Sequence, residues 1–376
     1  MSVTLLILIA LQASPGVSTG WTHHRGDAAL TGKAEGSLTL PLTQDWSVSV
    51  DSRVEGSPIV IGERLLMGSE DGHVHALDTS TGKPLWRKDL GAPIQSTPSM
   101  VGTLMVIGDN AGVVHGLDPA TGESRWRYTT GDKILGAANT FKAADRTLAI
   151  IGSYDGKVHA VDAATGKGVW THKTDNYVHG TPAISSGLVV VGGCDGVLHV
   201  LDATTGMSAG SVTVGPQIGG SAAMHETHAY IGHYGNQVEA LNLDTGEAVW
   251  RHKDRAFPYF SSPAVTDTLV VIGGRDQRIH GLERKTGKPR WTHRTRGKVD
   301  ASPVIVDGKV IVGSHDGRLR VLRLSDGEAL WTRDLGSPLL ASPAVVNGRV
   351  FMVSSRGEVR SYRSAPPAAK PDTVKR

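Results

Sequence analysis

The chain has little of what disulfide-rich and metal-binding proteins contain. Its 376 residues include one cysteine, Cys194, which excludes an internal disulfide and a zinc site built on paired cysteines. Cys194 ends an apolar run, so we expect an inert thiol at the end of a strand. The 39 basic and 36 acidic side chains nearly balance and no basic run occurs, so no nucleic-acid partner is expected.

Catalytic motifs and membrane-spanning segments are also missing. The sequence has no G-x-S-x-G, no H-E-x-x-H and no phosphate-binding loop, so we expect no catalytic residue and the sequence favours a protein that is not an enzyme. An apolar stretch from Val3 to Leu11 is too short to cross a bilayer but fits the apolar region of a secretory signal. We therefore predict a signal peptide over residues 1–20 and an exported protein, periplasmic or extracellular, without a transmembrane segment or a lipid-anchoring cysteine.

In place of such motifs, a ten-residue pattern recurs along the chain. "LDTSTGKPLW" ends at Trp86, and related stretches follow it. The spaced tryptophans stand at positions 46, 86, 126, 170, 250, 291 and 331, and Gly210 occupies the slot midway between 170 and 250. The chain therefore comprises eight units with a period of 40 to 44 residues. A period of this length indicates a solenoid or a propeller.

Each unit divides into four strand-like segments separated by turn residues. In the unit of Trp86 they are "SPIV", "RLLMG", "HVHALD" and "PLWRK", and Asp71-Gly72 predicts a tight hairpin between the second and third. Four antiparallel strands per unit are typical of a propeller blade. The sequence therefore predicts an all-β, eight-bladed β-propeller over residues 43–363, with the tryptophans at the contacts between blades.

The ends of the repeat predict how the ring closes. The repeats begin with a tryptophan segment, "LTQDWSVSV", and end with a third strand, "SSRGEVRSYR", that has no fourth after it. The N-terminal segment should therefore form the outermost strand of the last blade, so that the closed ring has no unpaired blade. Residues 21–42 are expected to be a lead-in, residues 364–376 a disordered tail, and the protein a monomer.

The pattern "DGxVxALDxxTGxxxW", with "SPxV" ahead of the next blade, resembles the quinoprotein (PQQ) repeat over nearly the whole chain. Two branches of that family have eight blades: the PQQ-dependent alcohol dehydrogenases and the non-catalytic BamB-like propellers of outer-membrane protein assembly. The length is close to the second branch. The dehydrogenase branch implies a vicinal Cys–Cys disulfide and a calcium site on long loops, whereas this chain has one cysteine and a nearly constant period.

The resemblance to the BamB-like branch implies a scaffold that binds a protein or peptide partner in the cell envelope, without a cofactor. The absence of a lipid-anchoring cysteine departs from that branch. Two other functions stay open. One is a PQQ-dependent oxidoreductase of alcohols or sugars, which would hold PQQ with calcium, and the other is a carbohydrate-binding propeller.

The eight units align with one another and show one variable position on the innermost strand. Four residues before the Pro of the "SP" pair every unit has an apolar residue, which predicts packing. Three residues before it the units carry Glu55, Gln95, Leu135, His179, Gly219, Phe260, Asp300 and Leu340. Side chains free to vary on an innermost strand should face the channel or its mouth. This ring predicts a solvated channel, with a shared cofactor pocket as the alternative.

Histidine recurs on the third strand, at positions 75, 115, 159, 199 and 280. These residues stand on different blades, on the order of 10 Å apart, whereas the ligands of one metal ion lie about 2 Å from it. We interpret them as packing or hydrogen-bonding residues and predict no metal site. "WTHHR" at 21–25 would chelate copper or nickel only if Trp21 were the first residue after cleavage.

A partner surface is predicted where the repeat fails. The fifth unit, counted from Trp46, has Gly210 in the tryptophan slot, Ala222 for the proline and Gly219-Gly220 on its innermost strand, which predicts a shallow recess. Aromatic loops of the neighbouring units should rim that recess, and packing between blades is the alternative role, for Tyr259 especially. The predicted partner-binding residues are Tyr154, Tyr177, His179, Tyr234, Phe257, Tyr259, Phe260, Arg275 and Asp300.

Overall fold

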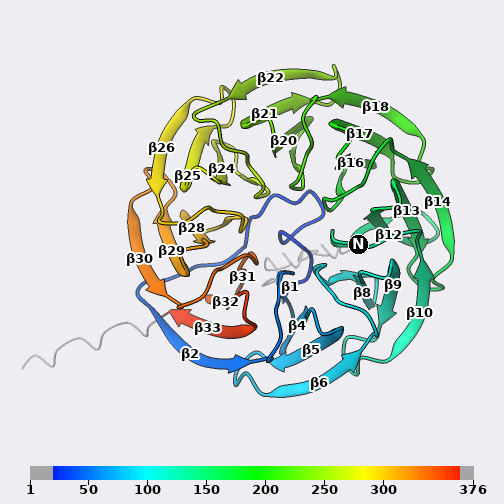
Figure 1. The fold of residues 1–376 in the computed structure, drawn as a ribbon, viewed down its shortest axis with the longest axis horizontal. Coiled ribbons are helices and arrows are strands. Elements are labelled where there is room, and N and C mark those ends of the chain that lie inside the picture. Colours follow the sequence, from blue (N-terminus) through cyan, green and yellow to red (C-terminus); the bar gives the residue numbers. More distant parts are fainter. Residues whose placement is uncertain (1–19, 365–376) are drawn as a thin grey trace, which may run out of the picture.

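Residues 20–364, which the computed structural model describes, form eight antiparallel sheets arranged around one axis (Figure 1). Each sheet is one blade of a propeller, and its strands follow one another outward from the axis. The predicted all-β fold of eight four-stranded blades is confirmed. No helix within the described range is long and apolar enough to cross a membrane.

The first four blades lie in chain order. Blade 1 has β3 (Ile59–Ile61), β4 (Arg64–Gly68), β5 (His73–Asp78) and β6 (Pro84–Asp89). Blade 2 has β7 (Ser99–Val101), β8 (Leu104–Gly108), β9 (Val113–Leu117) and β10 (Ser124–Thr129). Blade 3 has β11 (Asn139–Lys142), β12 (Thr147–Ser153), β13 (Lys157–Asp162) and β14 (Gly168–Lys173). Blade 4 has β15 (Ala183–Ser185), β16 (Leu188–Gly192), β17 (Val197–Asp202) and β18 (Ser208–Thr213).

The remaining blades complete the ring. Blade 5 has β19 (Ala223–His225), β20 (His228–His233), β21 (Gln237–Asn242) and β22 (Glu247–His252). Blade 6 has β23 (Ala264–Val265), β24 (Leu269–Gly274), β25 (Arg278–Glu283) and β26 (Pro289–Arg294). Blade 7 has β27 (Val304–Val306), β28 (Lys309–Gly313), β29 (Arg318–Arg323) and β30 (Ala329–Asp334). Blade 8 has β31 (Ala344–Val346), β32 (Arg349–Val353), β33 (Glu358–Ser364) and β2 (Leu42–Ser49).

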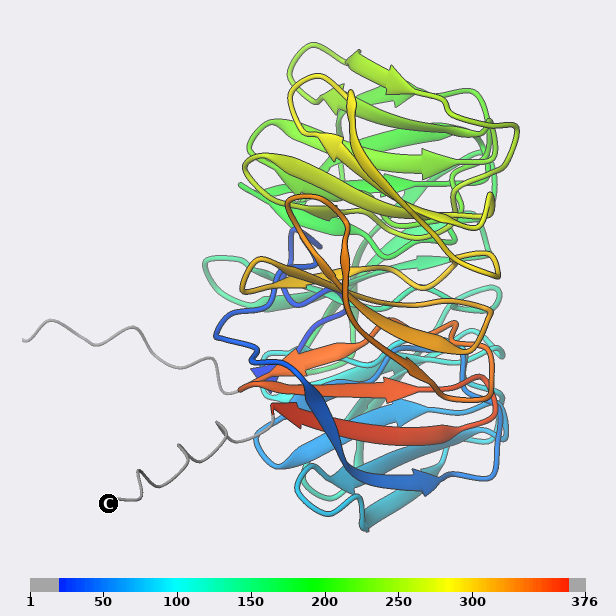
Figure 2. The same ribbon diagram turned by 90° about the vertical axis from the view of Figure 1, so that its left-hand side faces the viewer.

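The ring closes as the sequence predicts. Strand β2 is the outermost strand of blade 8 and pairs antiparallel with β33, with Trp46 opposite Ser361. In Figure 2 strand β2, in blue, crosses the outside of the C-terminal blade, in red. The two ends of the repeat therefore share one sheet, and the ring closes with a complete fourth strand in blade 8.

Most of the repeated tryptophans join one blade to the next through a hydrogen bond of the indole N–H. The indole N–H of Trp126 donates a 2.8 Å hydrogen bond to the carbonyl of Ala163, and its ring lies against the turn at Gly166, where φ is 72° and a Cβ would meet the ring. The same arrangement joins Trp250 to the carbonyl of Arg284. Gly210 belongs to blade 4, and nothing lies within 4 Å of a Cβ placed on it. The joint between blades 4 and 5 therefore lacks this contact.

A belt of hydroxyl groups encircles the axis one residue before each Pro position. In seven of the eight joints the backbone N–H at this position donates to the hydroxyl of the next blade, for example Ser57 to Thr97 and Ser262 to Ser302, each at 2.9 Å. Ala137 interrupts the belt because it has no hydroxyl. The hydroxyl belt consists of Ser57, Thr97, Thr181, Ser221, Ser262, Ser302 and Ser342.

The lead-in forms a plug across one end of the channel, which the sequence analysis did not foresee. We call residues 20–36 the plug. Strand β1 (Gly20–Trp21) pairs with β3, and the next residues hydrogen-bond the innermost strands of the following blades in turn. The innermost-strand N–H groups of Met100, Ile184, Met224, Val265 and Ile305 all donate to plug carbonyls. In Figure 1 this dark blue segment crosses the centre of the ring.

The expected signal peptide and tail fall almost entirely outside the described residues. Of the predicted signal peptide only Gly20 is described, and it lies in β1. Of the predicted tail only Ser364 is described, as the last residue of β33.

Candidate functional site

The partner surface predicted from the sequence lies on one face of the ring. We call this the loop face: it contains the turns between the second and third strands of each blade and the loops that enter the innermost strands. The plug hydrogen-bonds the innermost strands near the turns to the second strands, at the opposite end of the channel. The predicted aromatic residues therefore stand at the end of the channel that the plug leaves uncovered.

Three of the predicted residues come together between blades 3 and 4. The rings of Tyr154 and Tyr177 stack with centroids 4.8 Å apart and an interplanar angle of 14°. The Tyr154 hydroxyl hydrogen-bonds His179 Nδ1 at 2.6 Å, and Lys133 Nζ lies 4.5 Å from the centre of the Tyr154 ring. Burial raises the pKa of Tyr154 to about 12 and lowers the pKa of His179. The outer ring of the stack, Tyr177, remains 48% exposed and offers an aromatic face to solvent.

A second group spans blades 5, 6 and 7. Tyr234 and Phe260 meet edge to face with centroids 4.4 Å apart, and the Arg275 guanidinium carbon lies 3.5 Å from the centre of the Phe260 ring. Arg275 Nε and Nη2 also donate to the two oxygens of Asp300, at 2.9 and 3.0 Å. A guanidinium held at both oxygens of a carboxylate and stacked on a ring is positioned by three contacts.

Asp300 is the polar centre of this second group. It also contacts His315 Nε2 at 3.0 Å and Lys298 Nζ at 3.4 Å. Although burial opposes it, hydrogen bonding from His315 and Arg275, together with their charges, keeps the pKa of Asp300 well below its usual range. The carboxylate is therefore ionised at neutral pH, and it holds Arg275 over Phe260.

The recess predicted at Gly219 is filled, so this prediction is wrong. A Cβ at Gly219 would come within 2.8 Å of Phe260 Cδ1 and 3.1 Å of Tyr234 Cε2. The missing side chain therefore makes room for these two rings and leaves no hollow. The unit is also divided differently, because Gly210 lies in blade 4 and Gly219 and Ala222 precede β19 of blade 5.

The last two predicted aromatic residues have different positions. Tyr259 is 2% exposed, packs edge to face against His280 of blade 6 with centroids 5.5 Å apart and lies against Gly232 of blade 5, so it takes the alternative role of packing between blades. Burial, together with the charges of Asp276 and Asp254, raises the pKa of its hydroxyl. Phe257, in the same loop, is 47% exposed and remains available to a partner.

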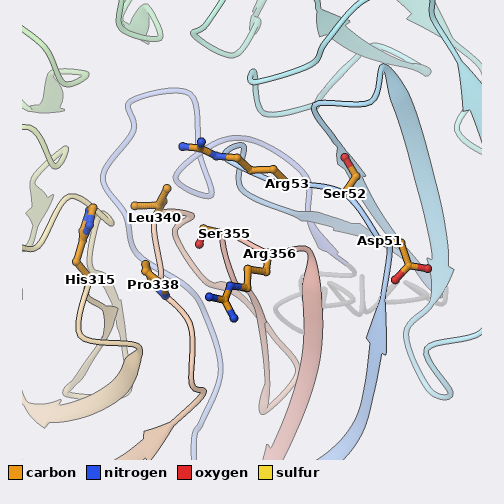
Figure 3. A pocket seen from close by; sticks show the side chains of 8 residues that line it. All are labelled: Asp51, Ser52, Arg53, His315, Pro338, Leu340, Ser355 and Arg356. Carbon is orange, nitrogen blue, oxygen red and sulfur yellow. The ribbon is translucent and has the colours of Figure 1, made fainter.

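A recess of about 600 Å³ opens on the loop face where blades 7, 8 and 1 meet (Figure 3). Leu340 is the member of the variable ring that borders it, as expected for a position at the mouth of the channel. Arg53 and Arg356 are the cationic side chains of the recess, and Arg53 also pairs with Glu55. Its lining consists of Asp51, Ser52, Arg53, His315, Pro338, Leu340, Ser355 and Arg356. The sequence does not predict this recess, because its residues come from three blades and follow no motif.

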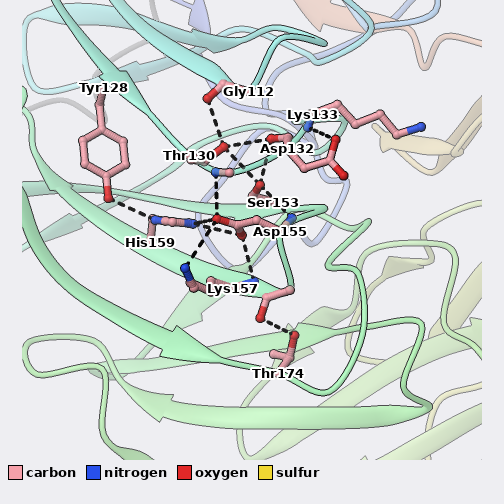
Figure 4. Close-up of polar contacts among 12 residues, drawn as sticks. Gly112, Tyr128, Thr130, Asp132, Lys133, Ser153, Asp155, Lys157, His159 and Thr174 are labelled. Atoms are coloured by element: carbon pink, nitrogen blue, oxygen red, sulfur yellow. Dashed lines mark hydrogen bonds and ion pairs between the residues drawn. The ribbon is translucent and has the colours of Figure 1, made fainter.

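The third-strand histidines hold the turns of the loop face, as the sequence interpretation expected. In blade 3, His159 Nε2 contacts both oxygens of Asp155, at 3.1 and 3.2 Å, and its Nδ1 meets the Tyr128 hydroxyl at 3.0 Å (Figure 4). Asp155 in turn accepts the N–H of Gly131 at 2.9 Å. Burial lowers the pKa of His159, so the ring is neutral at physiological pH. His199 and His280 likewise contact an aspartate of their own hairpin and a histidine ring of the preceding blade.

One group of side chains has the composition of a metal site. Asp254, Asp276 and His280 bring possible ligand atoms within 4.8 Å of one another. The guanidinium of Arg278 lies between them, with Nη1 3.0 Å from Asp254 Oδ2 and Nε 4.0 Å from Asp276 Oδ2. An arginine therefore supplies the positive charge that these carboxylates require, and we assign no metal ion there.

The closed ring of eight four-stranded blades and its recurring tryptophan contacts define the chain as a quinoprotein-repeat propeller. The family model described as outer membrane protein assembly factor BamB matches residues 43–144, 110–259 and 234–366. The chain belongs to this family.

Solved structures share the fold. BamB from Moraxella catarrhalis is 22% identical, with a TM-score of 0.72 over 88% of this chain and 100% of that one. The quinohemoprotein alcohol dehydrogenase of Comamonas testosteroni is 15% identical, with a TM-score of 0.78 over 95% of this chain and 82% of that one. The computationally designed Ika8 protein is 18% identical, with a TM-score of 0.75 over 85% of this chain and 99% of that one. No curated protein matches the chain.

Proposed function

We propose that the protein is a non-catalytic, exported scaffold that binds a protein partner through the loop face of blades 3 to 6. One observation carries the proposal. The three exposed aromatic side chains of the described range, Tyr177, Tyr234 and Phe257, are each 47–48% exposed and all lie in loops of this face. The other exposed large apolar residues, such as Leu85 and Val249, lie toward the outer rim of the blades. Exposed aromatic side chains beside a fixed arginine are typical of the centre of an interface.

The family supports the class of partner. The family model takes its description from an outer-membrane assembly factor, and a BamB is among the similar structures. A protein of the cell envelope is therefore the partner that we propose, and export through the N-terminal signal would bring this chain to it.

Site-specific crosslinking tests the proposal. A photo-crosslinking amino acid in place of Tyr177 should give one discrete adduct in the envelope of the producing cell. The same amino acid in place of Leu85, which has the same 48% exposure, is the matched control and should give no such adduct. Equal adducts at both positions, or none at Tyr177, would contradict the proposed face.

A second candidate function is a PQQ-dependent oxidoreductase. The observation that favours it is the likeness of the fold to two dehydrogenases. A quinohemoprotein alcohol dehydrogenase has a TM-score of 0.78 and a europium-containing methanol dehydrogenase one of 0.76. The test is to mix the purified protein with PQQ and calcium and to follow dye reduction with alcohols or sugars. Turnover above background would support this second function and count against the scaffold.

A further inference from the structure

The channel holds a buried cation whose hydrogen-bonding capacity is mostly unused. Arg25 is 1% exposed, and its one hydrogen bond runs from Nη2 to the carbonyl of Pro263 at 2.9 Å. Its Nε and Nη1 are buried and have no partner in the described part of the chain. A buried guanidinium normally satisfies all its N–H groups, because each unpaired group costs free energy comparable to a lost hydrogen bond.

No carboxylate of the described residues pairs with this cation. The nearest acid along the chain, Asp27, accepts hydrogen bonds from the backbone N–H and the hydroxyl of Thr31. Burial lowers the pKa of Arg25 to about 9, with the charge of Asp27 opposing the shift. The guanidinium therefore keeps its charge at neutral pH, and a positive charge stands inside the ring without an ion pair.

The position of Arg25 brings it to the hydroxyl belt. Arg25 belongs to the plug, and the carbonyl that it contacts belongs to Pro263, the residue after Ser262 of the belt. A Cβ at Gly32, where φ is 68°, would collide with the guanidinium. A glycine at this turn of the plug therefore leaves room for the Arg25 side chain. The guanidinium therefore reaches the strand segment that carries Ser262 of the belt.

The hydroxyl belt offers further hydrogen-bond donors around the axis. Each hydroxyl of the belt accepts a backbone N–H, and none is seen to donate within residues 20–364. The belt residues are buried but keep an exposed fraction of 3 to 7%. Seven hydroxyl protons and the three N–H groups of Arg25 Nε and Nη1 therefore have no acceptor within residues 20–364.

We propose that the channel binds a small anion at Arg25, with the hydroxyl belt as the surrounding donors. The ligand class is a compact acceptor of single negative charge, either a halide or a small carboxylate such as formate. Such an anion neutralises the buried charge and accepts from the unpartnered nitrogens. The site is independent of the loop-face partner surface, so either proposal can fail without the other.

The first experiment measures thermal unfolding against anion concentration at constant ionic strength, with sodium gluconate as the bulky replacement salt. Chloride, bromide and formate are the probes, and an anion that binds only the folded state raises Tm in a saturable way. We expect a rise of at least about 3 °C for wild type with the halides, with formate or with both. A response to the halides alone identifies a halide site, and a response to formate alone identifies a carboxylate site.

Two variants and one structure make the test decisive. Arg25→Met should remove the response to all three anions, whereas Arg356→Gln, which changes an exposed arginine of the loop face, should retain it. If Arg25→Met does not fold, crystals of the wild type grown in bromide decide the question. An anomalous peak beside the Arg25 guanidinium supports the site. The absence of that peak, or an equal Tm response in wild type and Arg25→Met, overturns it.

Discussion

The backbone N–H of Ser342 donates a 2.9 Å hydrogen bond to the hydroxyl of Ser57, across 285 residues of sequence. This bond joins blade 8 to blade 1 at the axis, while β2 joins the same two ends of the chain at the rim. Both contacts are long-range and neither forms until the ring closes. Substitutions in the hydroxyl belt therefore test how much each of its hydrogen bonds contributes to the closed ring.

Ser57→Ala should destabilise the closing joint. The substitution leaves the buried N–H of Ser342 without its acceptor, which costs about 1–3 kcal/mol of unfolding free energy. Ser57→Thr keeps the hydroxyl, as Thr97 and Thr181 do in the native belt, and should retain most of the stability. Urea unfolding of the two variants beside wild type provides the measurement, and equal losses in both would show that the hydroxyl is not responsible.

Ala137→Ser should have the opposite effect, because it fills the one gap in the belt. The backbone N–H of Thr97 finds no hydroxyl acceptor in the next blade, because Ala137 occupies that position. A new hydrogen bond there should add about 0.5–1.5 kcal/mol to the unfolding free energy. The neighbouring substitution Ala138→Ser places a hydroxyl outside the belt and should not stabilise the protein. A loss of stability in Ala137→Ser would show that the joint has no room for the oxygen.

Trp126→Ala tests the outer contacts between blades. The variant loses the ring that packs on Gly166 and the hydrogen bond to the carbonyl of Ala163, so we expect a cost of about 3–5 kcal/mol. Leu85→Ala, at an exposed position of an outermost strand, is the control and should change stability by less than about 0.5 kcal/mol. A small effect of Trp126→Ala in urea unfolding would mean that the blades are held chiefly at the axis.

Stability should fall as the pH drops from about 6.5 to 4, because buried histidines must stay neutral. Burial lowers the pKa of His75 from 6.5 to about 4 and that of His24 to about 3. In this window the unfolded chain binds protons that the folded protein does not, so each group contributes a slope of up to about 1.4 kcal/mol per pH unit. His75→Gln should flatten the slope by about one proton. Urea unfolding from pH 4.5 to 7.5 would show this, and an unchanged slope would contradict it.

The sequence predicts the fold far better than the site because the two depend on different kinds of information. The position of Trp46 before the first blade and the missing fourth strand after Tyr362 were enough to predict ring closure, since both belong to the repeat. The plug carries no repeat, and its contacts with successive blades follow from main-chain groups that any residue has. The filled space at Gly219 depends on rings from two other loops, which spacing along the chain does not reveal.

Partner binding should depend on the exposed aromatic side chains of the loop face. Tyr177→Ala together with Phe257→Ala should weaken binding of the crosslinked partner at least tenfold, about 1.4 kcal/mol, because exposed aromatic side chains contribute most at the centre of an interface. Both side chains are half-exposed in the free protein, so Tm should change little. The matched control is Leu85→Ala with Val249→Ala, which removes apolar side chains of equal exposure from outermost strands. If the control pair abolishes binding and the aromatic pair does not, the partner binds the rim of the propeller and not its loop face.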